Sequence, residues 1–159
     1  MLDYPIVFTL AHDLKFENGV ARVGTKGRAL MVFEEEEWWC HGVEPGGITA
    51  SGADPMSAFV SFREAFGAVL AEIATEAKSL PALEATIEKF VLETDATEAG
   101  RWDQARAEIR AGKDVAEPFK NLKRVVEEFR SMVNVGLLKR FEGTGGVEVA
   151  LAEAQAKAA

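Results

Sequence analysis

Apolar and polar residues alternate in short runs along the first fifty residues of the chain. This period of two, with many β-branched and aromatic residues, is typical of β-strands. Asn18 and Gly19 form the dipeptide that most favours a tight hairpin turn, because both central residues of a type I′ turn need a positive φ. The pattern predicts an antiparallel meander of four or five strands, with a further turn at residues 24–27 and one face exposed to solvent. The segments expected to contribute to these strands are residues 4–10, 15–17, 20–23, 28–33, 37–43 and 48–50.

From residue 54 the apolar residues recur every three or four positions, which is typical of amphipathic helices. Asp54 is a favourable N-cap and Pro55 suits the first helical position, so a helix is expected over residues 54–77. Its apolar face consists of Phe59, Phe62, Phe66, Val69 and Ile73. A second helix should begin at Ser79 and Pro81, and a third at Asp95, where Glu98 completes a capping box. Residues 89–94 could instead form a strand.

A fourth helix is expected from the most regular stripe of the sequence. Its members are separated alternately by four and three positions, a spacing that suits packing along one helical neighbour, in the same chain or in a second copy. We therefore expect self-association through Val115, Phe119, Leu122, Val126, Phe129 and Val133. The tail has a glycine-rich turn at residues 143–146. The alternation of Val147, Val149 and Leu151 after it fits either a short strand or a frayed helix.

These elements predict an α+β fold, with an antiparallel meander sheet packed on an amphipathic helix and a mainly helical C-terminal half. We expect a sheet-and-helix domain at residues 1–78. Residues 79–159 should form a helical extension that packs on this domain rather than folding independently.

Residues 39–58 carry the pattern W-x-x-x-V-x-P-G-G-x-x-x-S-G-x-D-x-x-x-A. With the strand before it and the helix after it, over residues 28–77, this stretch resembles the N-terminal domain of the HicB family of antitoxins. The resemblance rests on Val43, Pro45, Gly46, Gly52, Asp54 and Ala58. It implies direct binding and neutralisation of a small, basic, RNA-cleaving toxin, and self-association. Many members of that family also repress their own operon through a C-terminal DNA-binding domain. Residues 79–159 lack the short helix, glycine turn and basic recognition helix that such a domain needs.

Composition narrows the class of partner. The 159 residues are 48% hydrophobic and 28% charged, with a net charge of −8. This charge argues against direct binding to nucleic acid, because neutralising phosphates supplies most non-specific affinity. It either attracts a basic protein or only maintains solubility. The single cysteine excludes an intramolecular disulfide, and the apolar run at residues 5–11 is too short to cross a membrane. We expect a cytoplasmic protein that does not associate with membranes.

Four consecutive carboxylates, Glu34, Glu35, Glu36 and Glu37, are the most conspicuous candidate chemistry. Oxygen ligands of this kind bind Mg²⁺ and Ca²⁺, but neighbouring side chains on a strand point to opposite faces and cannot all converge on one ion. We expect a solvated hairpin turn, with no metal and no cofactor. Cys40 and His41 are also neighbours, so they cannot act together as nucleophile and base.

The same alternation separates the two tryptophans of residues 37–43. Trp38 and Cys40 should share one face of the strand, and Trp39 and His41 the other. Trp39 is either an exposed anchor for a partner or covered by a second layer of structure. The expected partner-binding residues are Glu34, Glu35, Glu36, Glu37, Trp39 and His41.

Three classes of function follow. The resemblance favours a HicB-like antitoxin or inhibitor of a basic RNA-cleaving protein. The alternative is an acidic inhibitor or decoy from a mobile element that acts on another host protein. An enzyme is the least supported class, because the sequence shows no nucleophile–base pair and no metal-ligand spacing.

Overall fold

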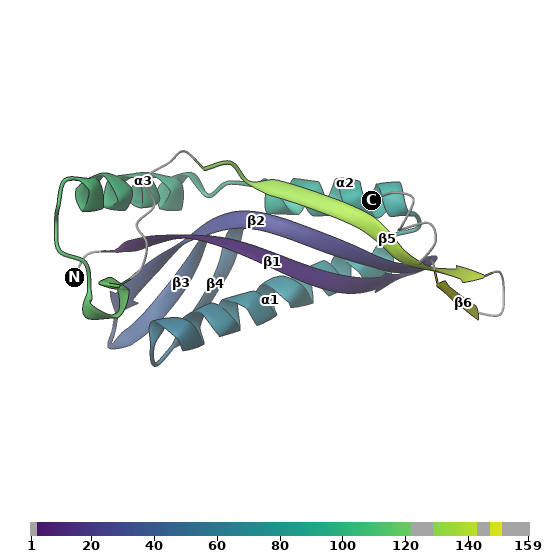
Figure 1. Cartoon of the computed structure of the whole chain (residues 1–159), viewed down its shortest axis with the longest axis horizontal. Helices are drawn as coiled ribbons and strands as arrows, with labels where there is room; N and C mark the ends of the chain where they lie inside the picture. The colour runs from purple at the N-terminus through teal and green to yellow at the C-terminus, as the bar shows by residue number, and fades with distance from the viewer. Residues whose placement is uncertain (1–2, 122–128, 143–146, 151–159) are drawn as a thin grey trace.

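The computed structural model describes residues 3–121, 129–142 and 147–150 of the chain, which form one six-stranded sheet with three α-helices (Figure 1). The predicted fold class, α+β with an antiparallel sheet, is confirmed. None of the described helices is long and apolar enough to span a membrane. The elements are β1 (Tyr4–Phe16), β2 (Gly19–Glu34), β3 (Glu37–Glu44), β4 (Gly46–Gly52), α1 (Pro55–Glu76), α2 (Leu80–Val91), α3 (Ala96–Arg110), a short 3-10 helix η1 (Glu117–Phe119), β5 (Met132–Glu142) and β6 (Val147–Ala150).

The sheet is organised around the long strand β2. Strand β1 pairs with one edge of β2 over its whole length, in an antiparallel register that runs from Tyr4 opposite Met31 to Phe16 opposite Gly19. Two strands share the other edge end to end. β5 pairs with the first half of β2, and β3 pairs with the second half. β4 and β6 continue the sheet beyond β3 and β5.

The turn expected at residues 24–27 does not form, because β2 runs through these residues without interruption. Gly27 is needed because other atoms approach its backbone closely, not because the chain turns there. A Cβ atom at this position would lie 2.4 Å from the carbonyl oxygen of Glu44 and 2.5 Å from the Phe8 ring. The register of β2 with β3 also shifts next to it, between Arg28 and Ala29. Gly27 therefore lies where the edge partner of β2 changes from β5 to β3.

The three predicted helix starts are confirmed. The Asp54 side chain accepts a hydrogen bond from the backbone N–H of Ser57 at 2.8 Å, and Pro55 is the first residue of α1. Ser79 and Asp95 cap α2 and α3 in the same way. These caps satisfy backbone donors that the first helical turn leaves unpaired. Helix α2 continues to Val91, so the alternative strand at residues 89–94 does not form.

Two hydrophobic cores lie on opposite faces of the sheet. The larger one is covered by α1, whose Phe62, Phe66 and Leu70 are fully buried against side chains such as Phe8 and Cys40. The smaller one lies under α3, where Trp102 covers Leu30, Val32 and Val43. Helix α3 therefore forms a second layer over part of the sheet (Figure 1).

The predicted fourth helix does not form over the described residues. Val115 and Phe119 are buried, and Phe119 belongs to η1, where its ring stacks on Tyr4 at 4.3 Å. Phe129 packs against Trp102, and Val133 lies in β5 opposite Thr25. Leu122 and Val126 lie outside the described residues. The stripe is therefore not one continuous surface, and self-association stays a prediction without this support.

Two local signals explain the strand that replaces the end of this helix. Pro118 interrupts helical hydrogen bonding. From Met132 to Leu137, Val133, Val135 and Leu137 alternate with more polar or smaller residues, a period of two. Of the two alternatives predicted for the tail, the short strand forms, as β6, up to Ala150. Leu151 lies outside the described residues.

Candidate functional site

Strand β3 places the two neighbouring tryptophans on opposite faces of the sheet, as the alternation predicts. Trp38 is 7% exposed and lies with the fully buried Cys40 in the core under α1. Trp39 and His41 are half-buried on the other face. Both interpretations of that face hold in part, because α3 buries Val43 completely and leaves Trp39 and His41 accessible.

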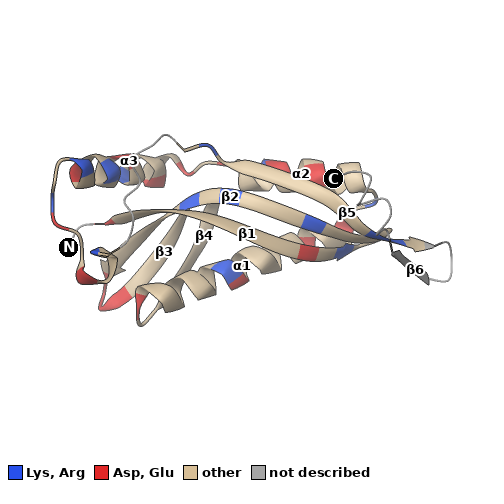
Figure 2. Ribbon diagram, in the orientation of Figure 1, with Lys and Arg blue, Asp and Glu red and all other residues tan. Residues whose placement is uncertain are grey.

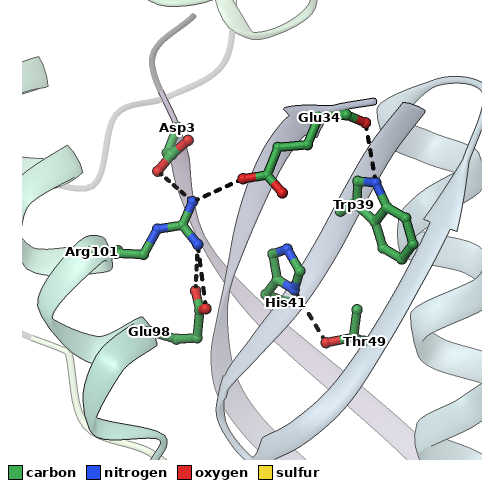
Figure 3. Close-up of polar contacts among 7 residues, drawn as sticks. All are labelled: Asp3, Glu34, Trp39, His41, Thr49, Glu98 and Arg101. Carbon is green, nitrogen blue, oxygen red and sulfur yellow. Dashed lines mark hydrogen bonds and ion pairs between the residues drawn. The ribbon is translucent and has the colours of Figure 1, made fainter. Parts of the chain in front are cut away.

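The accessible aromatic surface is held in a fixed geometry (Figure 3). The Trp39 and His41 rings are stacked, with centroids 6.1 Å apart and an interplanar angle of 4°. The indole Nε1 of Trp39 donates a hydrogen bond to the carbonyl oxygen of Glu34 at 3.3 Å. Nδ1 of His41 and Oγ1 of Thr49 are hydrogen-bonded at 3.2 Å. We call Trp39, His41 and Thr49 the aromatic patch.

The carboxylates Glu34, Glu35, Glu36 and Glu37 form the hairpin turn between β2 and β3, as expected, and we call them the acidic turn. Glu35 and Glu36 occupy its two central positions with φ values of 53° and 63°. All four residues are exposed. Within the part of the chain that the structure describes, Glu35, Glu36 and Glu37 form no ion pair. Three negative charges of the turn therefore face solvent, with no counter-ion among the described residues.

Glu34 differs, because an arginine of α3 binds it (Figure 3). The guanidinium of Arg101 lies 3.6 Å from Glu34, 3.1 Å from Asp3 and 3.3 Å from Glu98. Burial lowers the pKa of Arg101, but the carboxylates of Glu98, Asp3 and Glu34 more than offset this and raise it above its usual value. This ion-pair network ties α3 to the acidic turn and to Asp3, the residue before β1.

The described residues contain no group of three or more His, Cys, Asp or Glu side chains placed to hold a metal ion. Burial raises the pKa of the Cys40 thiol to about 12, so this side chain stays protonated at neutral pH. His12 lies against α1, with its ring stacked on Phe66 at 5.6 Å, and burial together with Arg63 lowers its pKa. The two histidines lie on opposite faces of the sheet. The site therefore offers an aromatic surface, hydrogen-bonding groups and negative charge, which are features that protein interfaces use.

Sequence reasoning placed Trp39, His41 and the acidic turn together but missed three members of the site. Thr49 could have been found, because β4 pairs it directly with His41 and alternation puts both on one face. Arg101 and Asp3 come from distant parts of the chain, and no local pattern links them to Glu34.

Comparisons with protein-family models, with curated proteins and with solved structures find no match to this chain. The resemblance to HicB therefore stays an interpretation of residues 28–77. In the structure this stretch forms the second half of β2, then β3, β4 and α1.

Proposed function

We propose that this chain is a HicB-like antitoxin or inhibitor, which binds a small, basic, RNA-cleaving protein directly and thereby blocks it. The observation that carries the proposal is the position of the acidic turn beside the aromatic patch. The proposal places the protein in the cytoplasm and requires no cofactor.

Charge and shape make separate contributions to such an interface. The net charge of −8 and three exposed carboxylates, Glu35, Glu36 and Glu37, which form no ion pair with any described residue, produce a negative field at this end of β3. A field of this kind accelerates and orients the approach of a basic partner, but it adds less to the lifetime of the complex. The patch contributes to the lifetime, because buried aromatic anchors carry most of the binding energy of typical interfaces.

The geometry of the patch favours tight binding. Trp39 is held by its hydrogen bond to Glu34 and by the stack with His41, so little conformational entropy is lost when a partner covers it. A flat indole face next to carboxylates also suits an arginine or lysine side chain, which can stack on the ring and pair with a carboxylate at once. Basic toxins present many such side chains.

The test begins with the reading frame beside the one that encodes this chain. A small basic protein encoded there should be inhibited in an RNA-cleavage assay by the purified chain. In surface binding kinetics, Trp39→Ala should raise the dissociation constant by roughly thirtyfold or more, because losing a central tryptophan anchor costs about 2 kcal/mol or more. Replacing both Glu35 and Glu36 by Gln should mainly lower the association rate at low salt.

The matched control is the double variant Glu84→Gln with Glu88→Gln, which removes the same charge from the exposed face of α2. It should change the association rate less than the acidic-turn variant does. Inhibition that persists at full strength in Trp39→Ala would contradict the proposed binding face. A neighbouring basic protein that the chain does not bind would contradict the proposed function.

A further inference from the structure

An open groove of about 560 Å³ lies where the start of α1 and the short helix η1 meet strand β1. We call it the apolar groove, because Thr9 and Asp54 are the only lining residues with polar side chains. Its apolar walls include Ile6 and Phe8 of β1, Met56 and Phe59 of α1, and Pro118 and Phe119 of η1. A cleft of this volume is in the range of sites that bind ligands.

Exposed apolar side chains extend the apolar groove toward the acidic turn. Met56 is 70% exposed at the start of α1, and Phe33 is 41% exposed at the end of β2. The Phe33 ring lies 5.2 Å from Trp38, and the Trp38 ring lies 5.5 Å from Phe119 in the groove wall, measured between centroids. Large apolar side chains that lie together on a surface mark an interaction site, whereas single ones are normal. The groove and Phe33 therefore form one apolar surface that is open to a partner.

Main-chain groups of β1 are not the means of binding in this groove. The indole Nε1 of Trp102 donates a hydrogen bond to the carbonyl oxygen of Ile6 at 3.2 Å. Pro5 has no N–H to donate, and both Tyr4 and Pro5 are buried. A partner strand would need free donors and acceptors along this edge. A protein occupant therefore has to fill the groove with its own side chains, as an amphipathic helix does.

The charges around this apolar surface are acidic. Asp54 is the only charged residue in the lining of the groove, and Phe33 directly precedes the acidic turn. Glu117 of η1 and Lys120 pair at 2.9 Å, so their charges offset one another. Figure 2 shows acidic residues of the β2–β3 turn and of the start of α1 at the same end of the molecule. A positively charged segment is therefore attracted to this end.

We propose that the apolar groove binds a basic amphipathic helix of a partner protein. Apolar side chains spaced three and four positions apart on one face of that helix enter between Met56, Phe59 and Phe119. Lysine or arginine side chains beside this face lie toward Phe33 and the acidic turn. The apolar groove is on the α1 side of the sheet and the aromatic patch on the α3 side, so this inference does not rest on the proposed function.

The described helices of a second copy do not supply such an occupant. Each of them buries its apolar stripe within its own chain, as Phe62 of α1, Ile87 of α2 and Trp102 of α3 show. Met56 is the exposed apolar residue of α1, but it belongs to the groove itself. A second copy would therefore have to associate groove to groove, and the oligomeric state of the chain tests this directly.

The probe is a fluorescent peptide of about 15 residues, which is long enough to form a helix. It has leucines at spacings of three and four along one face, lysines beside them and alanines elsewhere. Titrated into the full chain at low salt and followed by anisotropy, it should bind saturably with a dissociation constant below about 1 mM.

Two control peptides test the apolar face and the charge separately. A peptide of the same composition with its leucines spread around the helix should bind at least about tenfold more weakly, because it has no apolar face. A peptide with glutamates in place of the lysines should also bind at least about tenfold more weakly, because its charges are repelled by the acidic turn.

Two methionine variants locate the site. Met56→Gln should weaken peptide binding by roughly threefold or more, since a polar group replaces an apolar one in the groove. Met132→Gln is the matched control, because Met132 is 50% exposed on β5, on the other side of β2 from β1, and it should bind the peptide as the unmodified chain does.

Three outcomes would overturn the proposal. The first is no saturable binding up to about 1 mM peptide. The second is equal binding of either control peptide, or of the leucine–lysine peptide by Met56→Gln, since the groove would then not recognise a basic amphipathic helix. The third is a dimer of the chain alone that Met56→Gln abolishes, since the occupant would then be a second copy.

Discussion

Replacing each of the neighbouring tryptophans by alanine should affect stability very differently. Trp38 is 7% exposed and packs against Phe33 at 5.2 Å and Phe119 at 5.5 Å, measured between ring centroids. Truncating a buried tryptophan costs about 3–5 kcal/mol, because the transfer energy is lost and a cavity is left. For a chain of this size, this loss lowers the melting temperature by about 6–20 °C.

Trp39→Ala should cost much less stability than Trp38→Ala. It deletes the stack with His41, a type of contact that contributes about 0.5–1.5 kcal/mol. It also deletes one hydrogen bond to the Glu34 carbonyl in an exposed turn, which contributes about 1 kcal/mol or less. We therefore expect Trp39→Ala to lower the free energy of unfolding by about 1–2 kcal/mol, clearly less than Trp38→Ala does.

Urea unfolding followed by circular dichroism measures both values on the same scale. The slope of free energy against urea should be the same in both variants, so that differences in midpoint report stability directly. Trp39→Phe serves as a control, because it keeps an aromatic ring on His41 and loses the indole hydrogen bond. Equal losses in the two alanine variants, or a larger loss in Trp39→Ala, would show that the assignment of the two faces is wrong.

Two further predictions test buried positions of the sheet. Gly27→Ala should cost about 1–3 kcal/mol by overpacking, because its Cβ would lie 2.4 Å from the Glu44 carbonyl oxygen. Gly24→Ala in the same strand, where the nearest atom would be 4.0 Å away, should stay within about 0.5 kcal/mol of the unmodified chain in the same urea assay. Cys40 should not react with a thiol reagent at pH 8 until the chain unfolds, because burial raises its pKa to about 12. Above about pH 9 the folded chain keeps a proton on Cys40 that the unfolded chain releases. Cys40 should therefore cause the free energy of unfolding to fall as pH rises from about 9 toward 12. Urea midpoints measured across that range should lack this contribution in Cys40→Ala.

The parts of the fold that sequence reasoning predicted depend on interactions within a few residues. Asp54, Ser79 and Asp95 each accept a hydrogen bond from a backbone N–H three residues later, so the signal and its cause are both local. The faces of Trp38 and Trp39 follow from strand geometry alone.

The parts that it missed depend on distant contacts. The glycines of residues 24–27 predicted a turn, but what requires a glycine at Gly27 is the approach of Glu44 and Phe8. The helical spacing of the stripe from Val115 to Val133 was not decisive, because Val133 also begins an alternating run in β5. The pairing of β5 with β2 then joins parts of the chain that are far apart in sequence. In the site, sequence reasoning treated Glu34 as one of four equivalent carboxylates, whereas Arg101 of α3 binds it.

The division of one edge of β2 between β3 and β5 has a consequence for the order of folding. Strands β1 to β4 and helix α1 are neighbours in sequence, so they can pair as soon as they leave the ribosome. The first half of β2, by contrast, pairs at Gly19 with Arg140. Loop closure over such a separation is slow, and the open edge can recruit other strands during that time. The nascent chain therefore exposes half of its central strand until α2 and α3 have been made and β5 arrives to cover it.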